Sequence, residues 1–141
     1  MSQYGTDKPI LDARLTGSDL FTAPAGVKTK FYFTFDFDCK FNGTEVYAWD
    51  SNAGDKIELI TEYNAGAYGW KRYKKFGKEF NIFPNTLQKY ILFPTEPSAG
   101  VRLVVEYDNT GLTEVKFSLN IFLFTDQEIV KPSILQEGED W

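Results

Sequence analysis

Residues 30–41 alternate apolar and polar side chains over twelve positions, and this alternation constrains the fold more than any other feature of the chain. Successive side chains of a β-strand point to opposite faces, so the pattern predicts a long strand with one face in a core. The apolar face would hold Phe31, Phe33, Phe35, Phe37, Cys39 and Phe41. Asn42-Gly43 follows at once and is typical of a type I′ turn, because both central residues of that turn need a positive φ. The sequence therefore predicts a β-hairpin that turns at Asn42-Gly43 and continues over residues 44–49.

Shorter alternating segments recur along the rest of the chain, separated by Gly, Pro, Asn and Asp. About eight such segments, with no sustained 3.6-residue period, predict an all-β fold: a two-sheet antiparallel sandwich, jelly-roll-like. A helical turn is possible only around Thr86 to Lys89. Residues 1–10 and 126–141 show no periodicity. We therefore expect an N-terminal arm (1–10), a β-sandwich domain (11–125) and a C-terminal arm (126–141), with residues 22–26 forming a loop.

The chain contains no histidine, which limits its possible chemistry. The commonest general base, the Ser-His and Cys-His nucleophile pairs and the commonest transition-metal ligand are all excluded. The single cysteine, Cys39, falls on the inward face of its strand and is expected to be a core residue. We expect a protein that is not an enzyme, with no catalytic residue and no cofactor. A hydrolase that uses only carboxylates is the weakest alternative.

Acidic and amide side chains cluster at Asp50, Asn52, Asp55 and Glu58. Oxygen ligands of this kind suit Ca²⁺, but their spacing does not match the calcium-binding loop of an EF-hand. Turn chemistry explains these residues, because Asn and Asp side chains bond to nearby backbone groups. The sequence therefore predicts no metal site.

The net charge of −5 disfavours nucleic acid as a partner of the whole surface. The N-terminal residues show neither the basic start nor the apolar stretch of a signal peptide, and no apolar run approaches the length of a membrane helix. We expect a chain without a signal peptide and without a membrane partner.

Residues 68–78 are the most unusual local segment, because five Lys and Arg lie among four aromatic residues without one acidic residue. The remainder of the chain carries 10 Lys and Arg against 20 Asp and Glu. Three interpretations stay open: an exposed hairpin edge on which Lys prevents aggregation, a contact with an acidic protein, or a contact with nucleic acid or glycan. The candidate interface residues of this segment are Trp70, Lys71, Arg72, Tyr73, Lys74 and Lys75.

The C-terminal arm is acidic and carries three apolar residues that could anchor it on a neighbouring subunit, Ile134, Leu135 and Trp141. Phe122 and Phe124 lie on the face of the last long strand that is opposite its apolar core face. They form either a second buried face or an exposed patch that a partner covers. These five residues complete the candidate interface.

Three segments carry a resemblance to a known family: residues 54–59, residues 100–111 and residues 115–121. Small structural proteins of tailed-phage virions show a Gly-Asp-x-Ile-x-Leu strand, then a hairpin with Gly, Arg, Tyr and Thr-Gly, then a closing strand with Asn before an apolar residue. The chain is similar to them over about residues 35–124. The resemblance implies a capsid-, collar- or tail-associated role in a bacteriophage virion, with no catalytic residues to transfer.

The leading hypothesis is therefore a structural subunit of a phage virion that contacts its neighbours through its terminal arms. Its expected partners are other copies of itself and other virion structural proteins, and its expected location is the virion, after synthesis in the host cytoplasm. The alternative is a carbohydrate- or ligand-binding module that uses exposed aromatic residues for stacking. The candidates for that role are Tyr47, Trp49, Tyr68, Trp70 and Tyr73.

Overall fold

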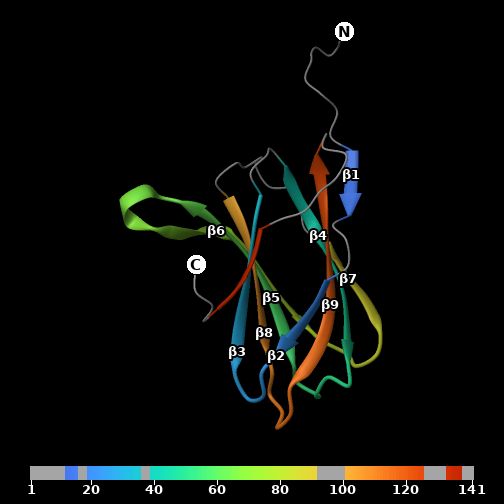
Figure 1. Cartoon of the computed structure of the whole chain (residues 1–141). Helices are drawn as coiled ribbons and strands as arrows, with labels where there is room; N and C mark the ends of the chain where they lie inside the picture. The colour runs from blue at the N-terminus through green and yellow to red at the C-terminus, as the bar shows by residue number, and fades with distance from the viewer. Residues whose placement is uncertain (1–11, 16–18, 36–38, 92–100, 126–132, 138–141) are drawn as a thin grey trace.

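A computed structural model describes residues 12–15, 19–35, 39–91, 101–125 and 133–137, which form two antiparallel β-sheets packed face to face (Figure 1). Sheet I consists of β1 (Asp12–Leu15), β2 (Asp19–Ala23), β9 (Val115–Thr125), β4 (Lys40–Trp49) and β7 (Leu87–Ile91). Sheet II consists of β10 (Ser133–Gln136), β3 (Lys28–Thr34), β8 (Val101–Asp108), β5 (Lys56–Asn64) and β6 (Trp70–Asn81). A short 3-10 helix, η1 (Gly66–Tyr68), joins β5 to β6. No helix in these ranges is long and apolar enough to cross a membrane.

The strand order is that of a jelly roll, which confirms the predicted fold class. Sheet I runs β2-β9-β4-β7 and sheet II runs β3-β8-β5-β6, so the chain passes repeatedly between the two sheets. Two further strands extend this eight-stranded arrangement. β1 pairs with the last residues of β9 beside β2, and β10 pairs with β3 at the edge of sheet II.

The core lies between the sheets and is rich in phenylalanine. Phe31 and Phe33 of β3 are 1% and 2% exposed, and Phe35, Cys39 and Phe41 are buried as well. Phe21 of β2 packs against Phe31, with ring centroids 5.2 Å apart. The inward register predicted for residues 31–41 is therefore confirmed at every described position; Phe37 lies outside the described residues.

The predicted hairpin at Asn42-Gly43 is wrong. β3 and β4 belong to different sheets, and Asn42-Gly43 lies inside β4 rather than at a turn. The pairing of β4 with β9 shifts register between Phe41 and Gly43, which marks a β-bulge, and Gly43 has a φ of 132°. Glycine adopts positive φ at low cost, so the same dipeptide that suits a tight turn also suits a bulge.

Other element boundaries also differ from the expectation. Of the loop expected at residues 22–26, residues 22 and 23 instead end β2, whose Phe21 and Ala23 contribute to the core and whose backbone pairs with β9. The basic and aromatic segment lies within one long strand from Trp70 onward, β6, and the possible helical turn at residues 86–89 is the start of β7. Residues 133–136, expected in an aperiodic arm, form β10. The proposed domain boundaries stay a prediction, since most of both arms lies outside the described residues.

The acidic turn between β4 and β5 closes one end of the sandwich. Asp55 is fully buried and accepts hydrogen bonds from the backbone N–H groups of Asn52, at 3.0 Å, and Thr110, at 2.9 Å. The hydroxyls of Thr110 and Tyr107 donate to the same carboxylate, each at 2.8 Å. Asp55 thus stabilises the turn, and no group of three or more His, Cys, Asp or Glu that could hold a metal occurs among the described residues.

Candidate interaction surface on the β5–β6 hairpin

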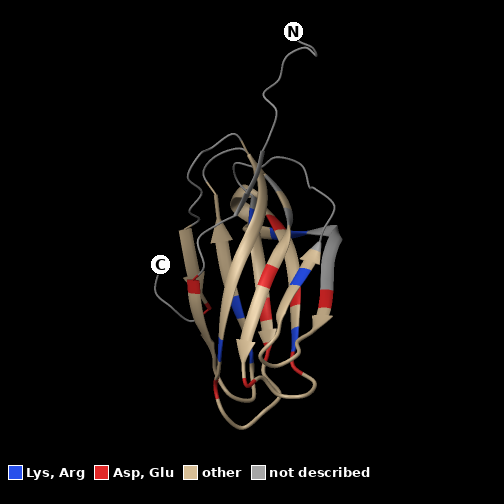
Figure 2. Ribbon diagram, turned by 90° about the vertical axis from the view of Figure 1, so that its right-hand side faces the viewer, with Lys and Arg blue, Asp and Glu red and all other residues tan. Residues whose placement is uncertain are grey.

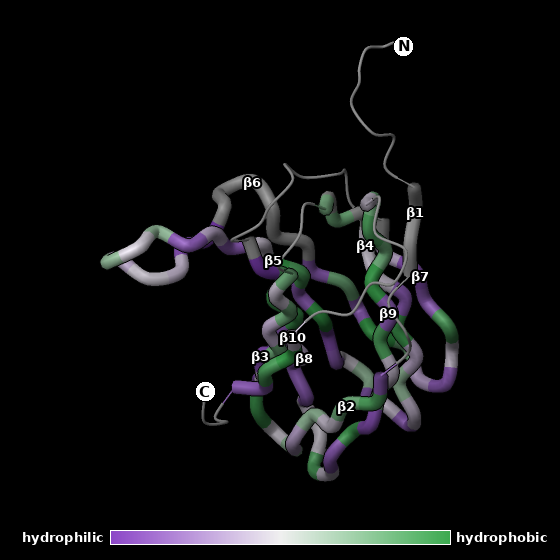
Figure 3. Tube along the Cα trace, turned by 45° about the horizontal axis from the view of Figure 1, so that its top comes forward, coloured by the Kyte–Doolittle hydropathy of each residue, from purple (hydrophilic) through white to green (hydrophobic). Residues whose placement is uncertain are grey.

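The β5–β6 hairpin (residues 56–81) projects from one side of the sandwich, as Figures 1 and 3 show. Tyr63 is the last β5 residue paired with β8, opposite Val101. Beyond it, Asn64 pairs with Trp70 across the hairpin. We call residues 63–72 the hairpin tip; within it, residues 64–70 extend past the last residue pair between β5 and β8.

Backbone hydrogen bonds define the conformation of the tip. The N–H of Gly69 donates to the carbonyl of Gly66 at 3.0 Å, and the N–H of Ala65 donates to the carbonyl of Gly69 at 2.8 Å. Gly69 has a φ of 76°, which favours glycine at this position. The side chain of Asn64 accepts a further bond from the N–H of Gly66, at 2.8 Å. The tip is thus a closed turn rather than an open loop.

Arg102 of β8 anchors the base of the hairpin. Its guanidinium lies 4.2 Å from the ring centroid of Tyr32 on β3 and 4.3 Å from that of Trp70 on β6. It also forms an ion pair with Glu62 of β5, with N···O distances of 2.8 Å from both Nε and Nη2. The side chains of Arg102 and Glu62 are only 9% and 16% exposed, so this pair is little screened by water or salt. We call Tyr32, Glu62, Trp70 and Arg102 the arginine clamp.

The electrostatics of the clamp follow from this burial. Burial raises the pKa of the Tyr32 phenol, against the opposing effects of Lys30 and Arg102. Tyr32 therefore stays neutral at physiological pH, and its ring offers a π face to the guanidinium. The clamp joins four strands of sheet II, so it fixes the direction in which the hairpin leaves the sandwich.

The tip presents aromatic rings and cations to solvent. Tyr68 is 80% exposed and Tyr63 is 38% exposed. Lys71 and Arg72 are exposed too, and Arg72 forms a surface ion pair with Glu58 at 2.9 Å. Figure 2 shows that acidic residues are spread over the strands of the sandwich and its end loops. The hairpin is thus a basic, aromatic projection on an acidic body.

The structure brings together only part of the predicted interface. Trp70, Lys71 and Arg72 share the hairpin. Tyr73, Lys74 and Lys75 continue β6, but their side chains lie outside the described part of the chain. Trp141 also lies outside it.

The other predicted interface residues lie elsewhere. Phe122 and Phe124 are half-buried on β9 of sheet I, where the Lys89 ammonium lies 5.8 Å from the Phe122 ring centroid. Ile134 and Leu135 pair with Phe33 and Tyr32 of their own chain. Contact of these residues with a partner stays a prediction.

Sequence reasoning missed Arg102, Glu62 and Tyr32. One signal was present: Arg102 is a charged residue next to a run of apolar residues in β8. The alternation of side chains along β8 predicts that Arg102 points away from the core. Its contacts, however, depend on which strands flank β8. That order is a property of the jelly roll and not of any local pattern.

No protein-family model and no curated protein matches the chain. Among solved structures, the crystal structure of the Yersinia pseudotuberculosis-derived mitogen (YPM) matches with a TM-score of 0.47 and 13% sequence identity, over 89% of this chain and 96% of that chain. The matching structure is thus a mitogen and not a phage protein. The expected kinship with tailed-phage virion proteins is corrected accordingly, as are the expected role as a virion subunit and the location in a virion. A likeness this distant assigns the chain no function in place of the corrected one.

Proposed function

We propose that this chain is a non-enzymatic binding module that docks through the β5–β6 hairpin onto an acidic protein surface. The observation that carries this proposal is an exposed aromatic and basic tip held on a buried arginine clamp. A rigid projection loses little conformational entropy when it binds, so more of its contact energy appears as affinity.

The composition of the tip supports a protein partner. Residues 63–70 consist of Tyr, Asn, Ala, Gly and Trp, and Arg72 follows. Antibody binding loops are enriched in Tyr, Gly and Asn, with Trp and Arg at their strongest contacts, because Tyr and Trp supply large rigid surfaces at low entropic cost. Trp, Tyr and Arg also dominate the energetics of protein interfaces in general.

The charge of the segment supports an acidic partner. Residues 68–78 carry five Lys and Arg and no acid. Complementary charge accelerates encounter and sets specificity. Another copy of this chain is one such partner, because outside the segment each copy carries 20 acidic against 10 basic residues.

Photo-crosslinking tests the proposal directly. Tyr68 is replaced by p-benzoylphenylalanine, and the matched control carries the same group at Leu112, which is 97% exposed in the β8–β9 turn. We expect position 68, and not position 112, to crosslink to Asp- and Glu-rich peptides. Dimers formed by the purified chain would identify another copy as the partner, whereas products seen only in cells would identify a different acidic protein.

Charge reversal provides the second arm of the test. Lys71→Glu with Arg72→Glu should abolish the crosslinks from position 68. The control, Lys28→Glu with Lys89→Glu, makes the same change in net charge at two other exposed lysines and should preserve them. Equal crosslinking at positions 68 and 112, or crosslinks to nucleic acid alone, would refute the proposal.

A further inference from the structure

An open cleft lies on the outer face of sheet I, on the opposite sheet from the hairpin. Its volume is about 510 Å³, within the range of small-molecule sites. It is lined by Leu20, Trp49, Asp50, Thr113, Glu114 and Lys116. Trp49 pairs with Lys116 across β4 and β9, and Lys116 pairs with Thr22 of β2. Three strands therefore form its floor.

One wall of the cleft is an exposed aromatic surface. Trp49 is 44% exposed and Leu20 is 62% exposed. The ring of Tyr47 lies 4.8 Å from that of Trp49, and Leu87, which pairs with Tyr47, is 58% exposed. Trp49, Tyr47 and Leu87 thus form one exposed apolar group on β4 and β7, and Leu20 lies across β9 from it, with Ser118 between Leu20 and Tyr47. Exposed apolar groups on a soluble surface mark binding sites.

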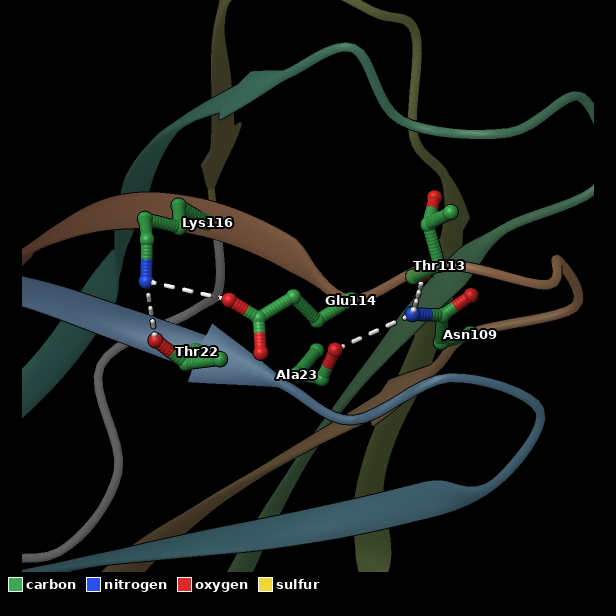
Figure 4. A network of polar contacts seen from close by, with 6 residues as sticks. All are labelled: Thr22, Ala23, Asn109, Thr113, Glu114 and Lys116. Carbon is green, nitrogen blue, oxygen red and sulfur yellow. Dashed lines mark hydrogen bonds and ion pairs between the residues drawn. The ribbon is translucent and has the colours of Figure 1, made fainter.

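The remaining walls are polar and held in place. The Lys116 ammonium donates to the hydroxyl of Thr22 at 3.1 Å and lies 3.4 Å from a carboxylate oxygen of Glu114 (Figure 4). Asn109 donates from its side-chain amide to the carbonyls of Ala23 and Thr113, both at 3.0 Å, and so fixes the loop beside the cleft (Figure 4).

Asp50 stands at the end of β4, next to Trp49. Asn85 donates from its side-chain amide to Asp50 Oδ1 at 3.0 Å, and its own Oδ1 accepts from the N–H of Asp50 at 3.2 Å. Both residues have a positive φ, 51° and 55°, a conformation that this reciprocal pair maintains. The carboxylate is thus oriented before any ligand arrives.

We infer that this cleft binds a neutral carbohydrate. A sugar ring has an apolar C–H face and a rim of hydroxyls that both donate and accept. The indole of Trp49 suits the face, while carboxylate, hydroxyl and ammonium groups suit the rim. An anionic ligand would meet Asp50 and Glu114 against Lys116 alone, and a purely apolar ligand would strip water from all three charges without replacing their hydrogen bonds.

The test is a binding screen with defined probes. The folded chain is titrated with neutral oligosaccharides of glucose, mannose, galactose, xylose and N-acetylglucosamine, and binding is followed by saturation-transfer NMR and tryptophan fluorescence. We expect one of these classes to bind with an affinity that changes little between low and physiological salt. A chain that binds none of them at millimolar concentration, or that binds only sulfated or carboxylated sugars, overturns the inference.

Three variants separate the cleft from other surfaces. Trp49→Ala should weaken sugar binding at least about tenfold, whereas Trp49→Tyr should retain much of it, because a ring remains. Tyr68→Ala, which removes an exposed ring from the hairpin, should leave sugar binding unchanged. Thermal melting verifies that each variant is folded. Unchanged binding by a folded Trp49→Ala variant would refute the assignment, and since hairpin and cleft lie on different sheets, either proposal can fail without the other.

Discussion

The phenol of Tyr107 donates a 2.8 Å hydrogen bond to the carboxylate of Asp55, which is fully buried at the end of the sandwich. Burial alone would raise the pKa of Asp55. The hydrogen bonds from Thr110, Asn52 and Tyr107 outweigh that effect, so the pKa lies below its ordinary value. Burial and the bond to Asp55 together raise the pKa of Tyr107. The two residues thus keep opposite, fixed protonation states.

The first prediction concerns the contribution of Asp55 to stability at different pH values. Because its pKa is lower in the folded than in the unfolded chain, its contribution is present above the unfolded value of about 3.9 and is lost as the pH falls below it. Asp55→Asn should lower the free energy of unfolding by about 1–3 kcal/mol at pH 7, since an amide cannot accept all four hydrogen bonds that the carboxylate accepts. Urea unfolding at pH 7 and pH 3 should show a smaller difference between variant and wild type at pH 3. If the two proteins differ in free energy of unfolding by the same amount at pH 7 and pH 3, the proposed dependence on the ionisation of Asp55 is wrong.

The second prediction concerns the arginine clamp. Arg102→Ala should lower the free energy of unfolding by about 3–5 kcal/mol, because it leaves the carboxylate of Glu62 without its partner in a mostly buried site. The double variant Arg102→Met with Glu62→Met should cost less than the single one, since no isolated charge remains. Urea unfolding gives both values. Hydrogen exchange of the amides at residues 64–70 should accelerate in Arg102→Ala, and unchanged exchange would show that the clamp does not hold the hairpin.

The third prediction concerns the bulge in β4. Gly43→Ala places a side chain on a residue whose φ is 132°, and should destabilise the fold by about 1–3 kcal/mol. Glu45→Ala, two residues further on the same strand, is the control and should cost under about 1 kcal/mol. Chemical denaturation gives the free energy of unfolding of each variant. An equal loss in Gly43→Ala and Glu45→Ala would mean that the backbone at Gly43 is not constrained.

The fourth prediction concerns β10. Truncation after residue 132 removes the strand that pairs with β3 and the 2.8 Å hydrogen bond from the N–H of Glu137 to the carbonyl of Lys30. The Tm should fall, and the uncovered edge of β3 should promote association, because unpaired strand edges recruit other strands. Calorimetry and sedimentation velocity measure the two effects. A truncated chain with the wild-type Tm would show that β10 contributes little.

Side-chain alternation was sufficient to predict the fold class and the core face of residues 31–41, because a period of two depends only on local geometry. It could not decide between a turn and a bulge at Asn42-Gly43, since both need a positive φ at glycine. β2 was missed because Pro24 and Gly26 follow it closely, while its burial comes from Phe31, Phe33 and Phe117 on other strands.

The two candidate sites were predictable to different degrees. The basic and aromatic composition of the hairpin is contiguous in the sequence and was recognised. The arginine clamp and the Trp49 cleft combine residues of separate strands, and the register of those strands follows from the packing of the whole sandwich. Trp49 was named only as one of several exposed rings, without its polar neighbours.

The pairing of β10 with β3 also has a consequence for synthesis on the ribosome. Ser133 and Thr34 are 99 positions apart, so at a translation rate of roughly 5–20 residues per second the partner of β3 emerges roughly 5–20 s after β3 itself. During most of that interval both edges of this phenylalanine-rich strand lack a partner, because β8 is also made late, and one edge then stays bare until β10 arrives. The yield of folded protein in the cell should therefore depend on the speed of elongation and on chaperones that bind this edge until β10 has been synthesised.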